Sequence, residues 1–475
     1  MPIIARGRII VTLLSVVWIC TVCWFEYFVF VKKGEACSWP DSKFAPPTNN
    51  DKPHHLLVIA DPQILDRHSY VDRNAFMSWL TQLIVDTNLR KNWWVGLSKK
   101  PDSVVFVGDL MDRGREDMPD AEYNAYVRRF KRIFNSKPSI PTYYATGNHD
   151  VGLGHGETFS PKRYDRYKAN FGPLNYQIQL ANHTLVFIDA PGYVDEESEL
   201  NTHPIPENPK HRVGGTYEFI ENFKKGKDPV ILFSHIPLYR PDGNGCGFLR
   251  ERGAIRPGNG LGYQNLLSKQ ATLKLLETFQ PDLILSGDDH DYCRYEHFVS
   301  STPERPNAPN AKEISIKSLS IAMGIKRPGF QLVSLAPPDL RKPAFQHKSL
   351  NDSPCFLPDQ LGIYLRIYIP LTVITIGILL MSNLCCWTSR RTSMRLTRGR
   401  RSSNLDIPLP LPVSAGVEKF ETPITLRTRP WLSPFVFCAV PRTQRRNALV
   451  NFLLDFRDTA LYPISVFVLT FWWFM

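Results

Sequence analysis

Apolar residues are grouped in two ways along this chain of 475 residues. Near both ends they form long runs, whereas from about His54 to Leu335 they form short runs separated by turns and by stretches with helical periodicity. Short β-rich runs that alternate with amphipathic helices predict an α/β layered fold in which most strands are buried. The predicted strands are Leu56–Ala60, Val104–Val107, Tyr143–Ala145, Leu185–Ile188, Val230–Phe233, Leu283–Leu285, Ile314–Ile321 and Phe330–Leu335.

The helices expected between these strands are marked by their end residues. Ser268 is a predicted cap for Ser268–Phe279, whose apolar side chains lie on one face. Ser160-Pro161 before Arg163–Phe171 supplies the cap and the first-turn proline of a shorter helix. Two further helices are predicted over Arg73–Leu89 and Pro119–Phe134, and no internal repeat is visible.

Three apolar runs are candidates for crossing a membrane. Ile9–Val31 is long enough for a helical span and contains one charge, Glu26. We favour an uncleaved anchor over a signal peptide, because the run is too long for a signal core and no small-residue cleavage site follows it. Ile367–Trp387 is uncharged and is the strongest candidate, whereas Ala460–Met475 is short enough to span or to lie in the interface. Two to three transmembrane helices are therefore expected.

The charge distribution predicts which side of the membrane each part occupies. The chain carries a net charge of +12, and Thr388–Val450 alone holds 12 Lys and Arg against 3 Asp and Glu, a surplus of 9. A basic surplus can indicate a nucleic-acid partner, but this segment adjoins a predicted span and Arg390–Arg401 lacks interleaved aromatic residues, so no nucleic acid is expected. The positive-inside rule predicts that the segment is cytosolic. The large region on the other side of Ile367–Trp387 is then lumenal.

Cysteines and sequons agree with a lumenal location. The cysteines of the predicted lumenal region are even in number and compatible with two disulfides, with Cys246–Cys293 a guess from position. Asn182-His183-Thr184 and Asn351-Asp352-Ser353 are glycosylation sequons. The lumenal cysteines are Cys37, Cys246, Cys293 and Cys355. The expected organisation is an N-terminal tail and anchor at 1–33, a lumenal domain at 34–360, a transmembrane helix at 361–387, a basic cytosolic loop at 388–450 and a transmembrane or interfacial helix at 451–475.

Residues with metal-binding side chains follow five of the predicted strands. Ligands of open α/β folds gather at the carboxyl ends of strands, so these residues are expected to meet. Each alone is ordinarily a helix cap or a turn residue, but hard oxygen donors together with imidazoles are the ligands that a pair of Mn, Fe or Zn ions requires. The segments are Asp61-Pro62-Gln63, Gly108-Asp109-Leu110-Met111-Asp112-Arg113-Gly114, Gly147-Asn148-His149-Asp150, Ser234-His235 and Ser286-Gly287-Asp288-Asp289-His290.

These five segments, in this order, resemble the signature of the calcineurin-like metallophosphoesterase superfamily, which is D-x-H, G-D-x-x-D, G-N-H-D/E, a lone H and G-H-x-H. The resemblance covers the middle region and implies a layered β-sandwich flanked by helices. Two positions differ, because Gln63 and Asp288 stand where the superfamily has His. With the segment 323–329 (Met-Gly-Ile-Lys-Arg-Pro-Gly) and the terminal spans, these departures resemble the fungal ethanolamine-phosphate phosphodiesterases that remodel the glycan of glycosylphosphatidylinositol (GPI) anchors.

The resemblance also implies a role for each site residue. The second metal would be held by Asp109, Asn148, His235 and Asp288, and the first by Asp61, Asp109 and His290, with Gln63 as a weak amide-oxygen ligand. Because Gln and Asp are harder ligands than imidazole, we expect Mn²⁺ rather than Zn²⁺. His149 is expected to protonate the leaving oxygen, oriented by Asp150.

The expected function is removal of ethanolamine phosphate from a mannose of the GPI glycan, in the membrane of the endoplasmic reticulum or early Golgi. A GPI-anchored protein or GPI lipid would be the substrate. Two alternatives stay open. One is a phosphomonoesterase or protein phosphatase, because Asp112-Arg113-Gly114 also occurs in such relatives. The other is a lapsed enzyme that acts as a scaffold for cargo-export machinery. The Gly- and Arg-rich segment Pro241–Gln264 is expected to be a solvated loop rather than a wall that grips phosphate.

Overall fold

The computed structural model describes residues 5–44, 52–136, 138–154, 156–202, 214–298, 310–337, 349–400 and 447–474. The chain divides into two compact units. The smaller unit combines Met1–Trp24 with Tyr364–Thr470, and the larger combines Phe25–Ile363 with Phe471–Met475. The larger unit contains every predicted strand and all five of the segments with metal-binding side chains.

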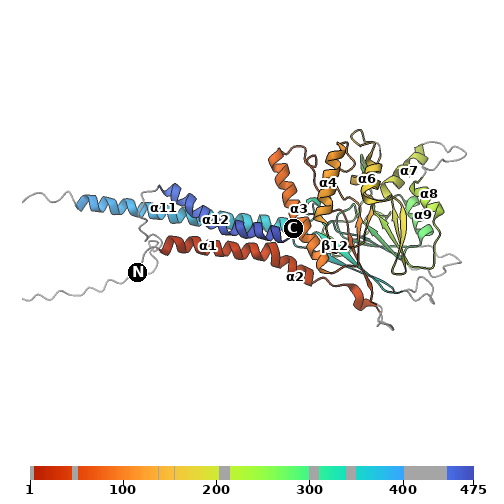
Figure 1. The fold of residues 1–475 in the computed structure, drawn as a ribbon, viewed down its shortest axis with the longest axis horizontal. Coiled ribbons are helices and arrows are strands. Elements are labelled where there is room, and N and C mark those ends of the chain that lie inside the picture. Colours follow the sequence, from red (N-terminus) through yellow and green to blue (C-terminus); the bar gives the residue numbers. More distant parts are fainter. Residues whose placement is uncertain are drawn as a thin grey trace, which may run out of the picture. The chain divides into compact units, whose positions relative to one another are not determined.

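The larger unit is a sandwich of two sheets with helices on both outer faces (Figure 1). The first sheet has the order β13-β12-β1-β2-β3, in which β1, β2 and β3 are parallel, β12 is antiparallel to β1 and β13 is antiparallel to β12. Its strands are β1 (His54–Ile59), β2 (Ser103–Val107), β3 (Thr142–Ala145), β12 (Gly329–Leu335) and β13 (Leu350–Phe356).

The second sheet has the order β10-β11-β9-β6-β5-β4. Its four inner strands are parallel, and β10 and β4 flank them in antiparallel orientation. The strands are β4 (Tyr176–Leu180), β5 (His183–Ile188), β6 (Val230–Ser234), β9 (Leu283–Ser286), β10 (Cys293–His297) and β11 (Ala311–Ser315). A small hairpin, β7 (Asn259–Gly260) and β8 (Tyr263–Gln264), lies outside both sheets.

Alternation along each strand produces the layers of the core. On β1, Leu56 and Val58 pack between the two sheets, whereas Leu57 and Ile59 point to the helices that cover the first sheet. These helices are α3 (Ala75–Ser98), α4 (Asp120–Ile133) and α6 (Arg163–Phe171). The outer face of the second sheet is covered by α7 (Ala190–Thr202), α8 (Thr216–Asn222) and α9 (Lys269–Phe279).

The predicted α/β class and sandwich are confirmed, and most predicted elements are present. The side chain of Ser268 caps α9 by accepting from Ala271 N at 3.0 Å. The predicted strand Ile314–Ile321 is wrong at its end, because β11 stops at Ser315 and a 3₁₀ turn, η3 (Ile321–Met323), follows. The edge strands β4, β10 and β13 were not predicted, since their residues include polar side chains that face solvent.

Two disulfides bond the predicted lumenal cysteines of the larger unit. Cys246 is bonded to Cys293, as expected from position, and Cys37 is bonded to Cys355. The second bond joins β13 to the short segment after α2 (Val29–Glu35), which leads through the 3₁₀ turn η2 (Pro40–Lys43) toward β1. Both disulfides therefore link segments within the larger unit.

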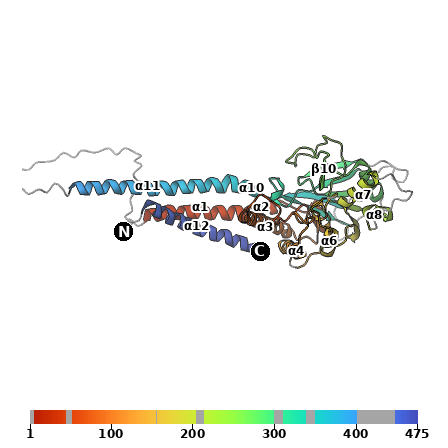
Figure 2. The same ribbon diagram turned by 90° about the horizontal axis from the view of Figure 1, so that it is seen from above.

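The smaller unit is a set of long helices that lie side by side in both views (Figures 1 and 2). Polar side chains connect them: Trp18 Nε1 donates to Thr375 Oγ1 at 3.0 Å, and Asn383 Nδ2 donates to Asp455 Oδ2 at 3.1 Å. Such pairs are typical of helices that pack in lipid. Its elements are α1 (Ala5–Cys23), the π-helical turn η5 (Tyr364–Tyr368), α11 (Ile369–Arg400) and most of α12 (Ala448–Trp473), whereas α10 (Gln360–Ile363) and most of the π-helical turn η1 (Trp24–Phe28) belong to the larger unit.

Among the described residues, two segments are long and apolar enough to cross a membrane, Ile9–Lys43 and Gln360–Leu384. The C-terminal helix α12 contains Asp455 and Asp458 and is not one of these two segments. α11 continues past the predicted end of the span at Trp387 to Arg400, and this part of the chain holds no helix breaker until Gly399. Most of the predicted basic loop, 401–446, lies outside the described residues.

Candidate metal centre

The turns after β1, β2, β3, β6 and β9 meet at one edge of the sandwich. Asp61 follows β1 and Asp109 follows β2, while His235 and Asp288 follow β6 and β9 of the other sheet. The short helix α5 (Asn148–Val151) begins directly after Gly147. The site is therefore shared by both sheets, as expected for the carboxyl ends of parallel strands.

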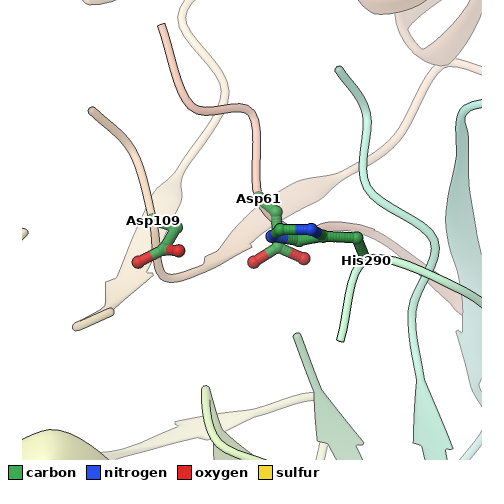
Figure 3. Close-up of side chains that lie close together, drawn as sticks. All are labelled: Asp61, Asp109 and His290. Atoms are coloured by element: carbon green, nitrogen blue, oxygen red, sulfur yellow. The ribbon is translucent and has the colours of Figure 1, made fainter. Parts of the chain in front are cut away.

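The predicted metal ligands form two groups that share one residue. The ligand atoms of Asp61, Asp109 and His290 lie within 4.8 Å of one another (Figure 3). Those of Asp109, His235 and Asp288 also lie within 4.8 Å of one another. Asp109 belongs to both groups, which is the position of a bridging carboxylate between two ions.

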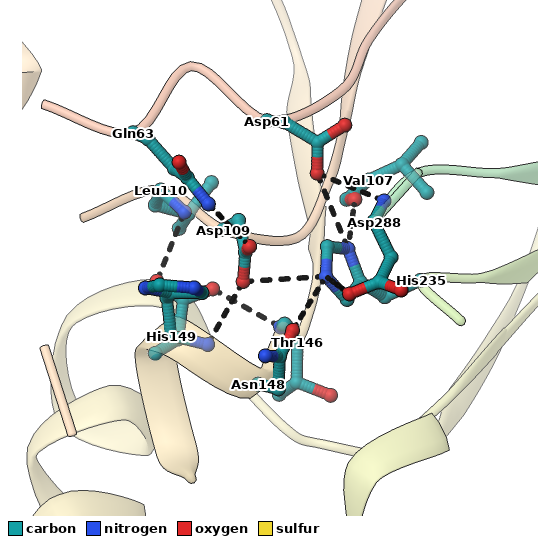
Figure 4. Close-up of polar contacts among 12 residues, drawn as sticks. Asp61, Gln63, Val107, Asp109, Leu110, Thr146, Asn148, His149, His235 and Asp288 are labelled. Carbon is teal, nitrogen blue, oxygen red and sulfur yellow. Dashed lines mark hydrogen bonds and ion pairs between the residues drawn. The ribbon is translucent and has the colours of Figure 1, made fainter. Parts of the chain in front are cut away.

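His235 is held in the orientation of a metal ligand. Its Nδ1–H donates to the carbonyl oxygen of Val107 at 2.8 Å, which leaves Nε2 as the free lone pair. Nε2 lies 3.2 Å from Asp109 Oδ1, 3.7 Å from Asp288 Oδ1 and 3.1 Å from Asn148 Oδ1 (Figure 4). Histidines that bind metals commonly donate their other ring nitrogen to a carbonyl in this way. The residues expected around the second metal are thus brought together.

Asn148 is turned toward the site by the loop Pro241–Gln264. Its amide nitrogen donates to the carbonyl oxygen of Gly262 at 2.9 Å, so its oxygen faces His235. Arg115 donates to the same Gly262 carbonyl at 3.2 Å and to the Asn148 carbonyl at 3.0 Å. Arg115 lies beside the second segment and was detectable by position, whereas a backbone contact such as that of Gly262 has no signal in the sequence.

Gln63 contacts the shared carboxylate directly. Its amide nitrogen donates to Asp109 Oδ2 at 2.6 Å, while the other carboxylate oxygen accepts from His149 N at 2.9 Å. The predicted role of Gln63 as an amide-oxygen ligand requires the amide to turn over. In the arrangement observed, Gln63 contacts Asp109 through its amide nitrogen, and its role as a ligand stays a prediction.

Backbone strain is concentrated at the predicted ligands. Non-glycine residues with positive φ are uncommon and costly, and they mark functional sites. Glycine is required where the loops touch: a Cβ on Gly108, whose φ is +76°, would lie 2.4 Å from His235 Nδ1, and one on Gly147 would lie 2.2 Å from Asp109 N. The strained ligands are Asp61, Gln63, Asp109, Asp288 and His290, with φ of 47°, 35°, 52°, 62° and 67°.

The electrostatics of the site are those of crowded, buried carboxylates. Burial, reinforced by the charge of Asp109, raises the pKa of Asp288 to about 7 and that of Asp61 well above its usual range. Burial also raises the pKa of Asp109, but the charges of His235 and His149 outweigh it and the net shift is downward. Burial lowers the pKa of His290 to about 4, so its imidazole is neutral, the form that binds a cation.

His149 has a different ring partner from the one expected. Its Nδ1–H donates to the backbone carbonyl of Asp112 at 2.6 Å. The carboxylate of Asp150 instead accepts from the N–H groups of Leu110 at 2.9 Å, Met111 at 3.2 Å and Gly147 at 3.1 Å. Asp150 therefore ties two site loops together, whereas the ring of His149 is held by the Asp112 carbonyl.

The loop between Pro241 and Gln264 is held against the site. Arg250 binds Asp289 with both terminal nitrogens, at 2.5 and 3.0 Å, and its side chain is only 4% exposed. The Cys246–Cys293 disulfide fastens the same loop. The expectation of a solvated loop is therefore wrong for Arg250, whose charge is matched by Asp289 and is not free for phosphate.

Comparison with known proteins identifies the family. The model of the calcineurin-like phosphoesterase family matches residues 54–292. Cell division control protein 1 of Saccharomyces cerevisiae is 34% identical over 368 residues, which cover 74% of this chain and 71% of that protein. The chain belongs to the calcineurin-like phosphoesterase family. It is accordingly a metal-dependent phosphoester hydrolase.

Two further matches have lower sequence identity. Metallophosphoesterase 1 of Cricetulus griseus is 25% identical over 302 residues, which cover 61% of this chain and 74% of that protein. A dimetal phosphatase from Danio rerio is 14% identical, with 64% of this chain and 99% of that one covered and a TM-score of 0.33.

The residues of this calcineurin-like phosphoesterase fit two divalent cations. Asp61 Oδ2 is buried and has no hydrogen-bond partner, although Asp61 Oδ1 accepts from Asp288 N at 3.0 Å. A buried carboxylate oxygen without a partner is costly unless a cation meets it. Oxygen donors combined with neutral imidazoles suit Mn, Fe or Zn. The set of donor atoms, the unpartnered Asp61 Oδ2 and the shared Asp109 all agree with two bound cations.

Proposed function

We propose that this enzyme is a lumenal two-metal phosphodiesterase that removes ethanolamine phosphate from a mannose of the GPI-anchor glycan. The observation that carries the two-metal chemistry is the pair of ligand groups that share Asp109. The choice of ethanolamine phosphate on a GPI mannose as the substrate rests on sequence resemblance, through Gln63, Asp288 and the segment 323–329. That segment is close to the site loop, because Arg252 donates to the carbonyl oxygens of Met323 at 3.2 Å and Gly324 at 3.0 Å.

Asp61, Asp109 and His290 would hold one cation, and Asp109, Asn148, His235 and Asp288 the other. When bound, such a pair supplies Lewis acidity and lowers the pKa of water at the site. The three carboxylates offset much of the cation charge and leave a net positive centre for a phosphodiester. Because Asp288 and Gln63 replace imidazoles, Mn²⁺ is the proposed metal. Stoichiometric zinc in active protein would contradict this choice.

His149 is the proposed general acid. Its Nδ1–H is fixed by the Asp112 carbonyl, and the side chain is 27% exposed, so Nε2 is the atom that exchanges a proton with the leaving oxygen. Replacing His149 with Gln should lower kcat by roughly 10²–10³ for an alkyl leaving group. A nitrophenyl diester should be affected far less, because its leaving group needs no proton. Equal losses with both esters would remove His149 from this role.

The proposed location is the endoplasmic reticulum or early Golgi, with 34–360 in the lumen and 388–450 in the cytosol. Two disulfides in the larger unit support an oxidising compartment. The basic surplus after the second candidate span supports the orientation. A membrane-anchored enzyme is suited to a lipid-linked substrate, either a GPI-anchored protein or a free GPI lipid.

The decisive experiment is mass spectrometry of GPI glycans from cells that lack this protein and are complemented with variants. Asp109→Asn should leave phosphoethanolamine on the glycan, as in the uncomplemented cells. Asp242→Asn, the same change at an exposed loop position, should restore the trimmed glycan. An identical phosphoethanolamine pattern with and without the protein would remove the proposed substrate, and rescue by Asp109→Asn would favour a scaffold.

A further inference from the structure

The helix α3 has apolar residues on two opposite faces. One face, which includes Val85 and Leu89, packs into the core beside the first sheet. The other carries Phe76, Trp79 and Leu83, whose side chains are 64%, 56% and 36% exposed. With 3.6 residues per turn, these three positions fall within about 60° of one another, roughly opposite the core face.

These three side chains form one surface. The rings of Phe76 and Trp79 lie 5.9 Å apart, and Leu83 follows Trp79 by four residues, about one turn of the helix. We call Phe76, Trp79 and Leu83 the α3 patch. Contiguous apolar surface of this kind marks a site of interaction, and Trp beside Phe and Leu is typical of a helix that lies in a membrane interface.

The far end of the same helix contacts the residues where the chain passes between the larger and smaller units. These passages are at Trp24/Phe25, Ile363/Tyr364 and Thr470/Phe471. Lys91 forms a buried ion pair with Glu26, and Glu26 also accepts from Gln360 at 3.1 Å. The ring of Trp94 lies 5.9 Å from Tyr27 and 5.3 Å from Phe474. α3 and the C-terminal residues are neighbours in both views (Figures 1 and 2).

Trp94 and the α3 patch lie on the same side of the helix. Trp94 follows Phe76 by five turns of an α-helix, so the two side chains have the same direction, about 27 Å apart along the axis. Tyr27, which contacts Trp94, lies in the candidate membrane span Ile9–Lys43, and Gln360, which donates to Glu26, begins the candidate span Gln360–Leu384. The apolar side of α3 is therefore continuous with the place where the chain enters the membrane.

We propose that the α3 patch lies in the interface of the lumenal leaflet, so that the catalytic unit rests on the bilayer as well as being anchored in it. We infer lipid rather than protein as the partner. The patch lies on the same side of α3 as Trp94, which contacts the segment that leads into the first candidate span. Burial of Phe76, Trp79 and Leu83 among acyl chains would remove their apolar surface from water.

Contact of the α3 patch with lipid would also position the metal centre, because the two are adjacent in the chain. Asp61 and Gln63 lie on the turn after β1, and the chain continues from that turn into α3. A helix fixed on the membrane surface would hold the metal-binding turn at a set height above the headgroups. The inference rests on the membrane anchoring but not on which phosphoester is cleaved.

The test uses the full chain in lipid nanodiscs with a photoreactive benzophenone side chain in place of Trp79. The matched control places the same group at Leu273, which is 44% exposed on α9, on the outer face of the other sheet. After irradiation we expect lipid adducts at position 79 to exceed those at position 273 by roughly tenfold, since only an interfacial side chain meets acyl chains. Mass spectrometry of the irradiated chain measures both yields.

Three results of the irradiation are distinguishable. Lipid adducts concentrated at position 79 support the proposal. A covalent link between two copies of the chain would show a dimer surface instead, and equal lipid yields at both positions would show a patch that faces water; either result overturns the proposal. Because both positions are exposed, unchanged unfolding temperatures of the two labelled proteins would verify that the fold is intact.

Discussion

Two buried clusters of charge in the larger unit differ in what balances their acidic side chains. Glu313 is fully buried, yet it is bound by Arg240 at 2.8 Å, by His297 at 2.6 Å and by the Ser286 hydroxyl at 2.8 Å. At the metal centre, by contrast, Asp61, Asp109 and Asp288 crowd around one buried imidazole, and Asp61 Oδ2 has no partner.

The pKa shifts express the same difference. Burial raises the pKa of Glu313, but Arg240 and His297 outweigh burial and the net shift is downward. Burial raises the pKa of Asp288 to about 7, and Asp109 adds to this shift. The charge of Glu313 is thus balanced by protein side chains, although Arg240 Nη2 makes no hydrogen bond, whereas the carboxylates of the metal centre are balanced only with cations. Four measurements test this difference between the two clusters.

The largest effect is expected from Asp109→Asn. This variant keeps the side-chain shape but removes the negative charge shared by both ligand groups, so hydrolysis of an aryl phosphodiester should fall on the order of a thousandfold or more. Metal analysis should show loss of both ions. Activity within a factor of a few of wild type would mean that the two groups do not act as one centre.

The next largest effect is on stability, from Glu313→Gln. It leaves the Arg240 guanidinium buried without a matching charge, which should lower the free energy of unfolding by about 3–5 kcal/mol. Chemical denaturation of the purified chain measures this value. The double variant Arg240→Met with Glu313→Leu should recover most of the loss, and no recovery would show that packing rather than charge sets the cost.

Removal of metal should lower the stability of the wild type by a smaller amount. Chelation should lower the unfolding free energy of the wild type by about 2.7 kcal/mol relative to protein with free metal a hundredfold above its Kd. The same treatment should leave Asp109→Asn unchanged and should affect Glu313→Gln as it affects wild type. A chelator effect that persists in Asp109→Asn would place the stabilising ion elsewhere.

The smallest effect is the pH dependence of the Glu313 cluster, measured on chelated protein. A carboxylate whose pKa is lower in the folded state stabilises the fold above the unfolded pKa, and this contribution is lost as pH falls through the folded pKa. Stability of the wild type should therefore decline below about pH 4.5, with a component that is missing in Glu313→Gln. Identical acid profiles would contradict the assigned shift.

The sequence predicted most of the fold and the identity of the site residues, but not all of the contacts within the site. Strand positions and the α9 cap follow from local pattern, because burial alternates along a strand and Ser268 acts within one turn. The site residues Asp61, Asp109 and His235 were found because each follows an apolar run. The partner of His149 was missed, since the Asp112 contact is made by a backbone carbonyl and every residue has one.

The sequence by itself determined the α/β class, the order of the metal-binding segments and the apolar runs at the two ends, because these depend on residue type and spacing alone. Which partners those residues contact became visible only in the folded chain. Only the meeting of two sheets shows that Asp109 serves two ligand groups, and that the Val107 carbonyl fixes the ring of His235. Likewise, the apolar residues of α3 divide into a core face and an exposed face only once the sheet beneath them is in place. The physical reason is that charge balance and burial depend on neighbours far apart in the chain.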